Sequence, residues 1–140
     1  MAPRHFRELQ CWQLADELRR EVHAICANSA LSADRRFCDG FRDASGSVCR
    51  NLAEGFTRFH SGEIVQFFTY ALASLAEVQD YLSESLVRDA LSRARYDQLI
   101  DLSEHVKATA TNFMRPHQRK PRKHPAHRTS HVAQHVARRT

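Results

Sequence analysis

Glycine and proline are scarce in this sequence, with four residues of each among 140. Because both residues interrupt helices, their scarcity leaves room for long helical segments. A helix that crosses a membrane requires an apolar run of about 18 residues, and the sequence contains no such run. These absences exclude a membrane-spanning helix and favour a helical domain, and 140 residues suffice for one domain with a real core.

Paired cysteine motifs are also absent, although the sequence contains four cysteines, all within its first 49 residues. No two of them form a Cys-x-x-Cys pair, and the first residues lack the apolar segment of a secretory signal peptide. We therefore expect reduced thiols and a cytoplasmic protein.

A cysteine-bound metal is the alternative interpretation of these residues. Cys38 and Cys49 would share a helix face but lie about 16 Å apart along its axis, at about 1.5 Å per residue. That separation is too large for one tetrahedral zinc ion unless Cys11 or Cys26 also contributes. The spacing favours four small, buried thiols and no metal.

The carboxylate pattern of di-iron bundles is missing as well, because no Glu-x-x-His occurs. The pairs His60 with Glu63 and Glu77 with Asp80 do not complete such a site. Without a catalytic constellation, we expect no enzymatic activity and no cofactor.

Acidic residues are absent from the last part of the chain. All 16 lie between Glu8 and Glu104, whereas eight of the 21 Lys and Arg residues lie from Arg115 onward. Up to Met114, 13 basic residues therefore stand against 16 acidic residues, a net charge of −3, and the tail carries +8. The basic character of the chain belongs to its tail, so it gives no reason to expect nucleic-acid binding by the folded body.

Four amphipathic helices are predicted by apolar residues at helical spacing. They cover about residues 8–27, 33–54 and 63–86, followed by a fourth that Ser92 caps and Pro116 ends. Ser32 or Asp34 can cap the second of these helices. With short connections, the expected fold is all-α, an antiparallel up-down-up-down four-helix bundle. We expect a leader at 1–7, the bundle at 8–114 and a disordered, basic, His-rich tail at 115–140.

The third helix has an apolar arc of about half its circumference, which is wider than a surface helix needs. Its main seam consists of Ile64, Phe68, Ala71, Leu75, Val78 and Leu82. The flanks of this seam are the candidates for a subunit interface: Val65, Phe67, Tyr70, Leu72, Ala76 and Tyr81.

Asn51, Glu54 and Arg58 form the most site-like polar group, since residues three or four apart share a helix face. A hydrogen-bond network that ties the end of the second helix to a neighbour explains them, and a ligand or partner contact is the alternative. Gly55 is expected to end the second helix in a left-handed conformation, and Ser61 to cap the third.

Three segments resemble the family of four-helix-bundle proteins known as 23S rRNA intervening-sequence proteins. Residues 6–15, FRELQCWQLA, are similar to the family's opening helix with its Trp-Gln-x-Ala. Residues 51–58, NLAEGFTR, resemble its Asn-Ile-Ala-Glu-Gly-x-x-Arg, and EIVQFF at 63–68 with ASLAE at 73–77 resembles its third helix. The sequence departs from the family at Arg42-Asp43, where a basic pair is usual, and at Cys49-Arg50, where proline is usual.

This resemblance implies a four-helix bundle that assembles into a homo-oligomer, typically a ring of five, without catalytic residues. We therefore expect a scaffold or adaptor protein. The alternative, implied by the accessory proteins of diversity-generating retroelements, is a protein that binds nucleic acid or a reverse transcriptase. The candidate nucleic-acid contacts are the basic residues of the tail: Arg115, Arg119, Lys120, Arg122, Lys123 and Arg128.

Overall fold

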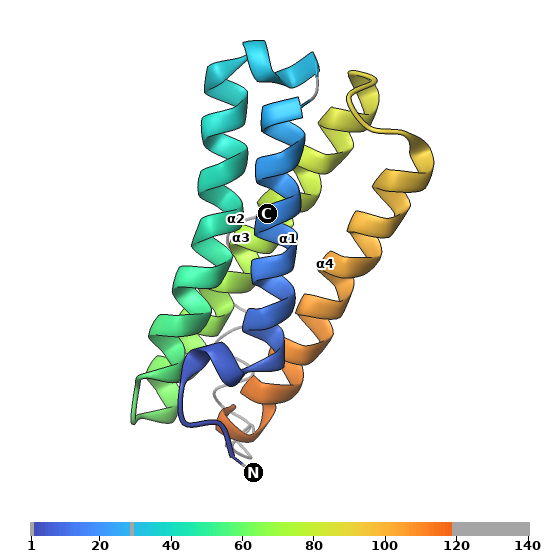
Figure 1. Ribbon diagram of the computed structural model, residues 1–140. Helices are drawn as coiled ribbons and strands as arrows, with labels where there is room; N and C mark the ends of the chain where they lie inside the picture. The colour runs from blue at the N-terminus through green and yellow to red at the C-terminus, as the bar shows by residue number, and fades with distance from the viewer. Residues whose placement is uncertain (1, 29, 119–140) are drawn as a thin grey trace, which may run out of the picture.

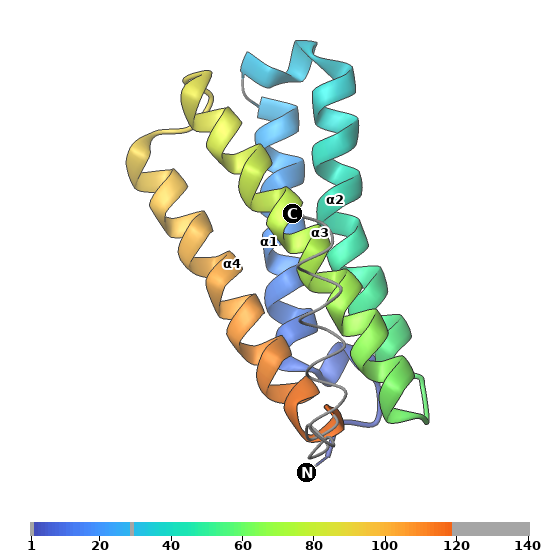
Figure 2. The same ribbon diagram turned by 180° about the vertical axis from the view of Figure 1, so that it is seen from behind.

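The computed structural model describes residues 2–28 and 30–118 and contains four long helices over that part of the chain. They are α1 (Gln10–Asn28), α2 (Arg35–Phe56), α3 (Ser61–Val87) and α4 (Arg93–Met114). Three short 3₁₀ helices flank them: η1 (Phe6–Glu8), η2 (Ala30–Ala33) and η3 (Arg115–His117). Figures 1 and 2 show the antiparallel arrangement, and the predicted all-α four-helix bundle is confirmed.

The four helices occupy the corners of a square bundle. Each packs against its neighbours in the chain, and α4 returns to pack against α1. α1 and α3 therefore lie at diagonally opposite corners. This placement matters for the surfaces discussed below, because the outward side of α3 is remote from the groove between α1 and α2.

Two predicted helix caps are confirmed. The Asp34 side chain accepts a hydrogen bond from the backbone N–H of Phe37 at the start of α2, and Ser92 does the same for Arg95 at the start of α4. The prediction for Ser61 is wrong, because His60 occupies the capping position of α3 and makes no side-chain cap hydrogen bond. Ser61 is instead the first helical residue.

Gly55 was expected to end α2 in a left-handed conformation, and this expectation is also wrong. α2 continues through Phe56, and no described glycine has a positive φ. The left-handed residue is instead Asp89, with φ 58°, two positions after the end of α3. Gly55 is buried within α2, where its lack of a side chain allows α3 to approach closely.

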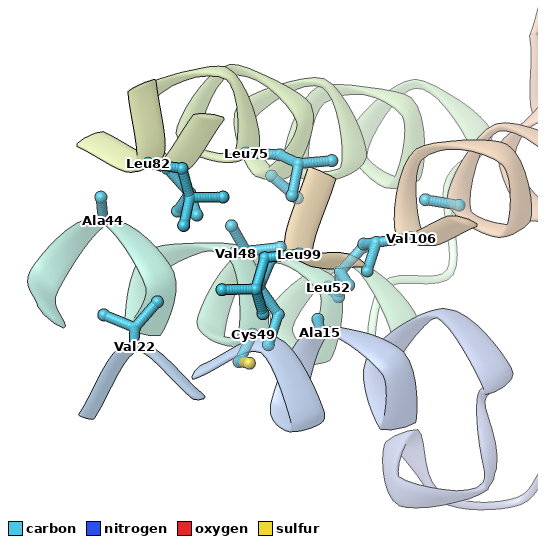
Figure 3. Close-up of a cluster of buried hydrophobic side chains, with 14 of the residues drawn as sticks. Ala15, Val22, Ala44, Val48, Cys49, Leu52, Leu75, Leu82, Leu99 and Val106 are labelled. Atoms are coloured by element: carbon cyan, nitrogen blue, oxygen red, sulfur yellow. The ribbon is translucent and has the colours of Figure 1, made fainter. Parts of the chain in front are cut away.

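The core is formed by apolar residues from all four helices (Figure 3). Val22 of α1, Val48 of α2, Leu82 of α3 and Val106 of α4 point into one cluster. All six seam residues of α3 are buried, as predicted. α4 ends at Met114, two residues before Pro116. None of the helices in the described ranges combines the length and apolarity that a bilayer crossing requires.

Candidate interaction surfaces

The outward side of α3 is uncharged over half of the helix. No charged residue lies between Glu63 and Glu77. This stretch nevertheless faces solvent with five exposed side chains, which are Gln66, Thr69, Tyr70, Ala73 and Ala76. We call these five residues the α3 strip. Exposed helix surfaces usually carry charges, so a strip of this composition is a candidate contact surface.

The other predicted interface residues on α3 are less exposed than Tyr70 and Ala76. Val65 and Leu72 are half-buried and pack against the bundle core. Phe67 is also half-buried, with the guanidinium carbon of Arg58 4.8 Å from its ring centroid and the Tyr70 ring 6.0 Å away. These three residues therefore border the strip, and part of each side chain is already covered within the protomer.

Tyr81 occupies an intramolecular position that the sequence analysis did not anticipate. Its ring stacks on Phe41 at 5.2 Å and meets the edge of Phe37 at 5.1 Å, beside Gly40 of α2. Aromatic pairs at these distances stabilise the fold beyond their buried area. The contact gives Tyr81 a packing role within the protomer, and its assignment to a subunit interface stays a prediction. The glycine inside α2 was the signal that a large side chain approaches there.

The predicted polar group at the end of α2 separates into two arrangements. Asn51 donates to the carbonyl of Ser47 at 2.9 Å and to its hydroxyl at 3.1 Å. That hydroxyl lies 2.8 Å from the hydroxyl of Ser74 on α3. Asn51 thus belongs to a short polar bridge between α2 and α3, which fits the expected structural role.

Glu54 and Arg58 form the second arrangement. They are joined as an ion pair one helical turn apart, and Arg58 also reaches Glu63 at 3.5 Å. Glu54 therefore has the cationic partner that its position near the end of α2 requires. Arg58 connects the end of α2 to the first turn of α3, and its Nε is buried without an acceptor among the described residues.

All four cysteines are buried, as predicted. The Sγ of Cys38 lies 3.2 Å from the Leu31 carbonyl oxygen, and the Sγ of Cys26 lies 3.9 Å from the carbonyl oxygen of Cys38. Burial raises the pKa of Cys11 and of Cys49 to about 11, and burial together with the neighbouring Cys38 thiol raises that of Cys26 to about 12. These thiols stay protonated near neutral pH, which makes them poor nucleophiles. In the described part of the chain, no cluster of three or more His, Cys, Asp or Glu side chains is arranged to hold a metal ion.

A groove lined by arginine and aromatic side chains runs between η1, α1 and α2. Its lining contains Arg7, Arg19 and Arg50 but no carboxylate, together with Phe6, Trp12, Cys49 and Ala53. We call it the arginine groove. The sequence analysis missed it, because the net charge of −3 for the body conceals how the helices bring these arginines together.

Two aspartates beside the arginine groove pair with two of its three arginines. Asp16 is largely buried and pairs with both Arg19 and Arg20, the latter at 2.8 Å. Asp43 pairs with Arg50 at 3.1 Å. The three arginines that line the groove thus stand against two aspartates, which leaves an excess of one positive charge among these five residues.

Of the predicted nucleic-acid residues, only Arg115 is described, and it is exposed at the start of η3. Arg119, Lys120, Arg122, Lys123 and Arg128 lie outside the described residues.

The fold and these surfaces define a small helical bundle with candidate contact surfaces and four buried thiols. The sequence matches the family model described as 23S rRNA-intervening sequence protein over residues 7–112. The chain therefore belongs to the 23S rRNA-intervening sequence protein family, as its three motifs indicated. None of the curated proteins matches it.

Proposed function

We propose that this protein is a non-enzymatic, homo-oligomeric scaffold or adaptor that self-associates through the α3 strip. The observation that carries the proposal is the 13-residue stretch between Glu63 and Glu77, which contains no charged residue and exposes the five side chains of the strip. Charged residues are depleted at the centres of protein interfaces, where burying an unpaired charge is costly.

The side chains of the strip suit a helix-to-helix contact. Ala73 and Ala76 are small and permit close approach of a partner, whereas Tyr70, 48 % exposed, offers an aromatic anchor of the kind enriched at interface centres. Tyr70 is held by a 2.7 Å hydrogen bond from Gln66 to its hydroxyl. An anchor that is already ordered costs less conformational entropy on association.

The size of the strip sets a requirement on the interface. Thirteen residues extend about 20 Å at about 1.5 Å each, and a helix about 10 Å wide then presents roughly 200 Å². A stable interface buries about 800 Å² per partner, so the contact must extend beyond α3. Phe59, 97 % exposed in the connection that precedes α3, offers further apolar surface at that end of the helix.

The subunit number is proposed from family resemblance alone, as a ring of five. A ring requires that two different surfaces of each protomer meet. We also propose that the protein acts in the cytoplasm, which is consistent with four unpaired thiols buried in its core.

Sedimentation velocity of the full chain over a range of concentrations tests self-association. The proposal predicts a species whose mass is a multiple of the 16.1 kDa chain. The fraction of the protein in this species should rise as the protein concentration increases through the micromolar range. A single 16.1 kDa species throughout that range would overturn it.

A further inference from the structure

We propose that the arginine groove binds single-stranded nucleic acid, with its arginines contacting backbone phosphates and its aromatic rings stacking against a base. This proposal is independent of self-association, because the groove lies between α1 and α2 and α3 is at the opposite corner from α1. It also differs from the expectation for the tail, since every residue involved belongs to the folded body.

Arg7 and Arg50 are available for a ligand. The Arg50 side chain is 62 % exposed, and its partner Asp43 is 78 % exposed. An ion pair between two side chains this exposed contributes little to stability, so Arg50 can exchange it for a phosphate at little cost. Arg7 is exposed, with its guanidinium carbon 5.5 Å from the centroid of the Phe6 ring. Guanidinium groups match phosphate geometry through paired N–H donors.

Trp12 provides the flat surface that the tail lacks. Its ring is half-buried, contacts the ring of Phe6 edge-on at 5.1 Å and has the guanidinium carbon of Arg19 6.0 Å from its centroid. Stacking of a base on an aromatic ring strengthens binding and tolerates any sequence. Arg19 is held by Asp16, which fixes its position beside the Trp12 ring.

The dimensions of the groove favour a chain over a small molecule. Its volume is about 240 Å³, below the about 300–1,000 Å³ of pockets that enclose small ligands. A strand that crosses the surface needs room for only one phosphate and one base at a time. An acidic peptide would use the arginines but has no need of the half-buried Trp12 ring beside them, so the ring favours nucleic acid.

The experiment uses the single tryptophan of the full chain as a local reporter. Trp12 emission and the anisotropy of a fluorescein-labelled oligothymidylate are measured in parallel titrations. We expect the oligonucleotide to quench Trp12 emission with the same midpoint as the rise in anisotropy. Binding at the tail alone would raise anisotropy and leave Trp12 unchanged, which would overturn the proposal.

The double variant Arg7→Gln/Arg50→Gln supplies the second test. Both residues are exposed, so circular dichroism should show an unchanged fold. We expect the quenching midpoint to move to at least about a tenfold higher concentration. The slope of log K against the logarithm of salt concentration should fall in magnitude by about 1.4, because each of the two lost phosphate contacts on a single strand contributes about 0.7. The matched control Arg36→Gln/Arg93→Gln also removes two exposed arginines, but outside the groove.

Two results would contradict the assignment. Equal losses of affinity in the groove variant and in its control would show that only total charge matters. Quenching of Trp12 by polyglutamate with an affinity equal to that of the oligonucleotide would identify an acidic protein segment, rather than nucleic acid, as the ligand. Neither result bears on the oligomer mass, so failure here is distinguishable from failure of the scaffold proposal.

Discussion

A Cβ atom at Gly55 would lie 2.7 Å from Cδ1 of Phe68, so the closest approach of α2 and α3 depends on a missing side chain. Phe68 is fully buried and stacks on Phe113 of α4 at 5.0 Å, which leaves its ring no room to move away. The glycine of the NLAEGFTR segment thus has a packing role in the core.

Replacing Gly55 with alanine should destabilise the protein, although alanine is the better helix former. Overpacking costs about 1–3 kcal/mol, which exceeds the about 1 kcal/mol gained in helix propensity. Urea unfolding measures the difference. The control is Gly62→Ala in α3, where an added Cβ meets nothing within 4 Å and stability should be unchanged or slightly higher. A more stable Gly55→Ala variant would contradict the packing role.

The two tyrosines of α3 should respond differently to truncation. Tyr81→Ala removes the stack on Phe41 and Phe37 and should lower the free energy of unfolding by about 3 kcal/mol. Tyr70→Ala alters an exposed ring and should change it by less than about 0.5 kcal/mol. Both are measured by urea unfolding at concentrations where sedimentation shows monomers. Equal effects would place Tyr81 outside the core packing.

Asp34 should give the protein a pH-dependent contribution to stability in the acid range. Its hydrogen bond with Arg88, at 2.8 Å, and then that from the Phe37 N–H lower its pKa below the ordinary 3.8. A lowered pKa stabilises the fold above about pH 4 and stops doing so as pH falls through the folded-state value.

Urea midpoints of wild type and Asp34→Asn test this contribution. Asparagine keeps a capping oxygen but no charge, so wild type should be the more stable at neutral pH and the gap should close in acid. In an Arg88→Gln background the gap at neutral pH should shrink. A gap that stays constant with pH would contradict the ion-pair account.

The buried thiols should resist modification in the folded protein. With pKa values of about 11 for Cys11 and Cys49 and about 12 for Cys26, thiolate is scarce near pH 8. Ellman's reagent should react slowly with the native chain and quickly with all four thiols in guanidinium chloride. An Ala24→Cys variant, at an exposed position of α1, supplies the fast native reference. Rapid labelling of a native cysteine in the unmodified chain would show that its site opens.

The fold could be predicted from the sequence because helical periodicity directly reflects burial. The seam from Ile64 to Leu82 was found from spacing alone. The cap Ser92 was found from its residue type, and so was Asp34, as one of two candidates with Ser32. Gly55 was assigned wrongly because glycine both ends helices and permits close packing, and only the position of Phe68 distinguishes the two roles.

The arginine groove could not be predicted, because charge was summed along the chain instead of over a surface. Arg7, Arg19 and Arg50 belong to three different elements, and each lies close in sequence to acidic residues. Only the packing of α1 against α2 shows which arginines share a face. The packing of Tyr81 was missed for a related reason, since its partners Phe37 and Phe41 lie forty or more residues earlier.

The most direct test of self-association through the α3 strip is the mass in solution of the Ala73→Arg variant. Arginine is a good helix former, and Glu77 four residues later can pair with it, so the monomer should fold. The matched control Ala108→Arg places an arginine at an exposed alanine of α4, four residues after Glu104. Sedimentation velocity should show a multimer for wild type and for Ala108→Arg but a 16.1 kDa species for Ala73→Arg. Monomeric wild type, or an Ala73→Arg variant with the wild-type mass, would contradict the account.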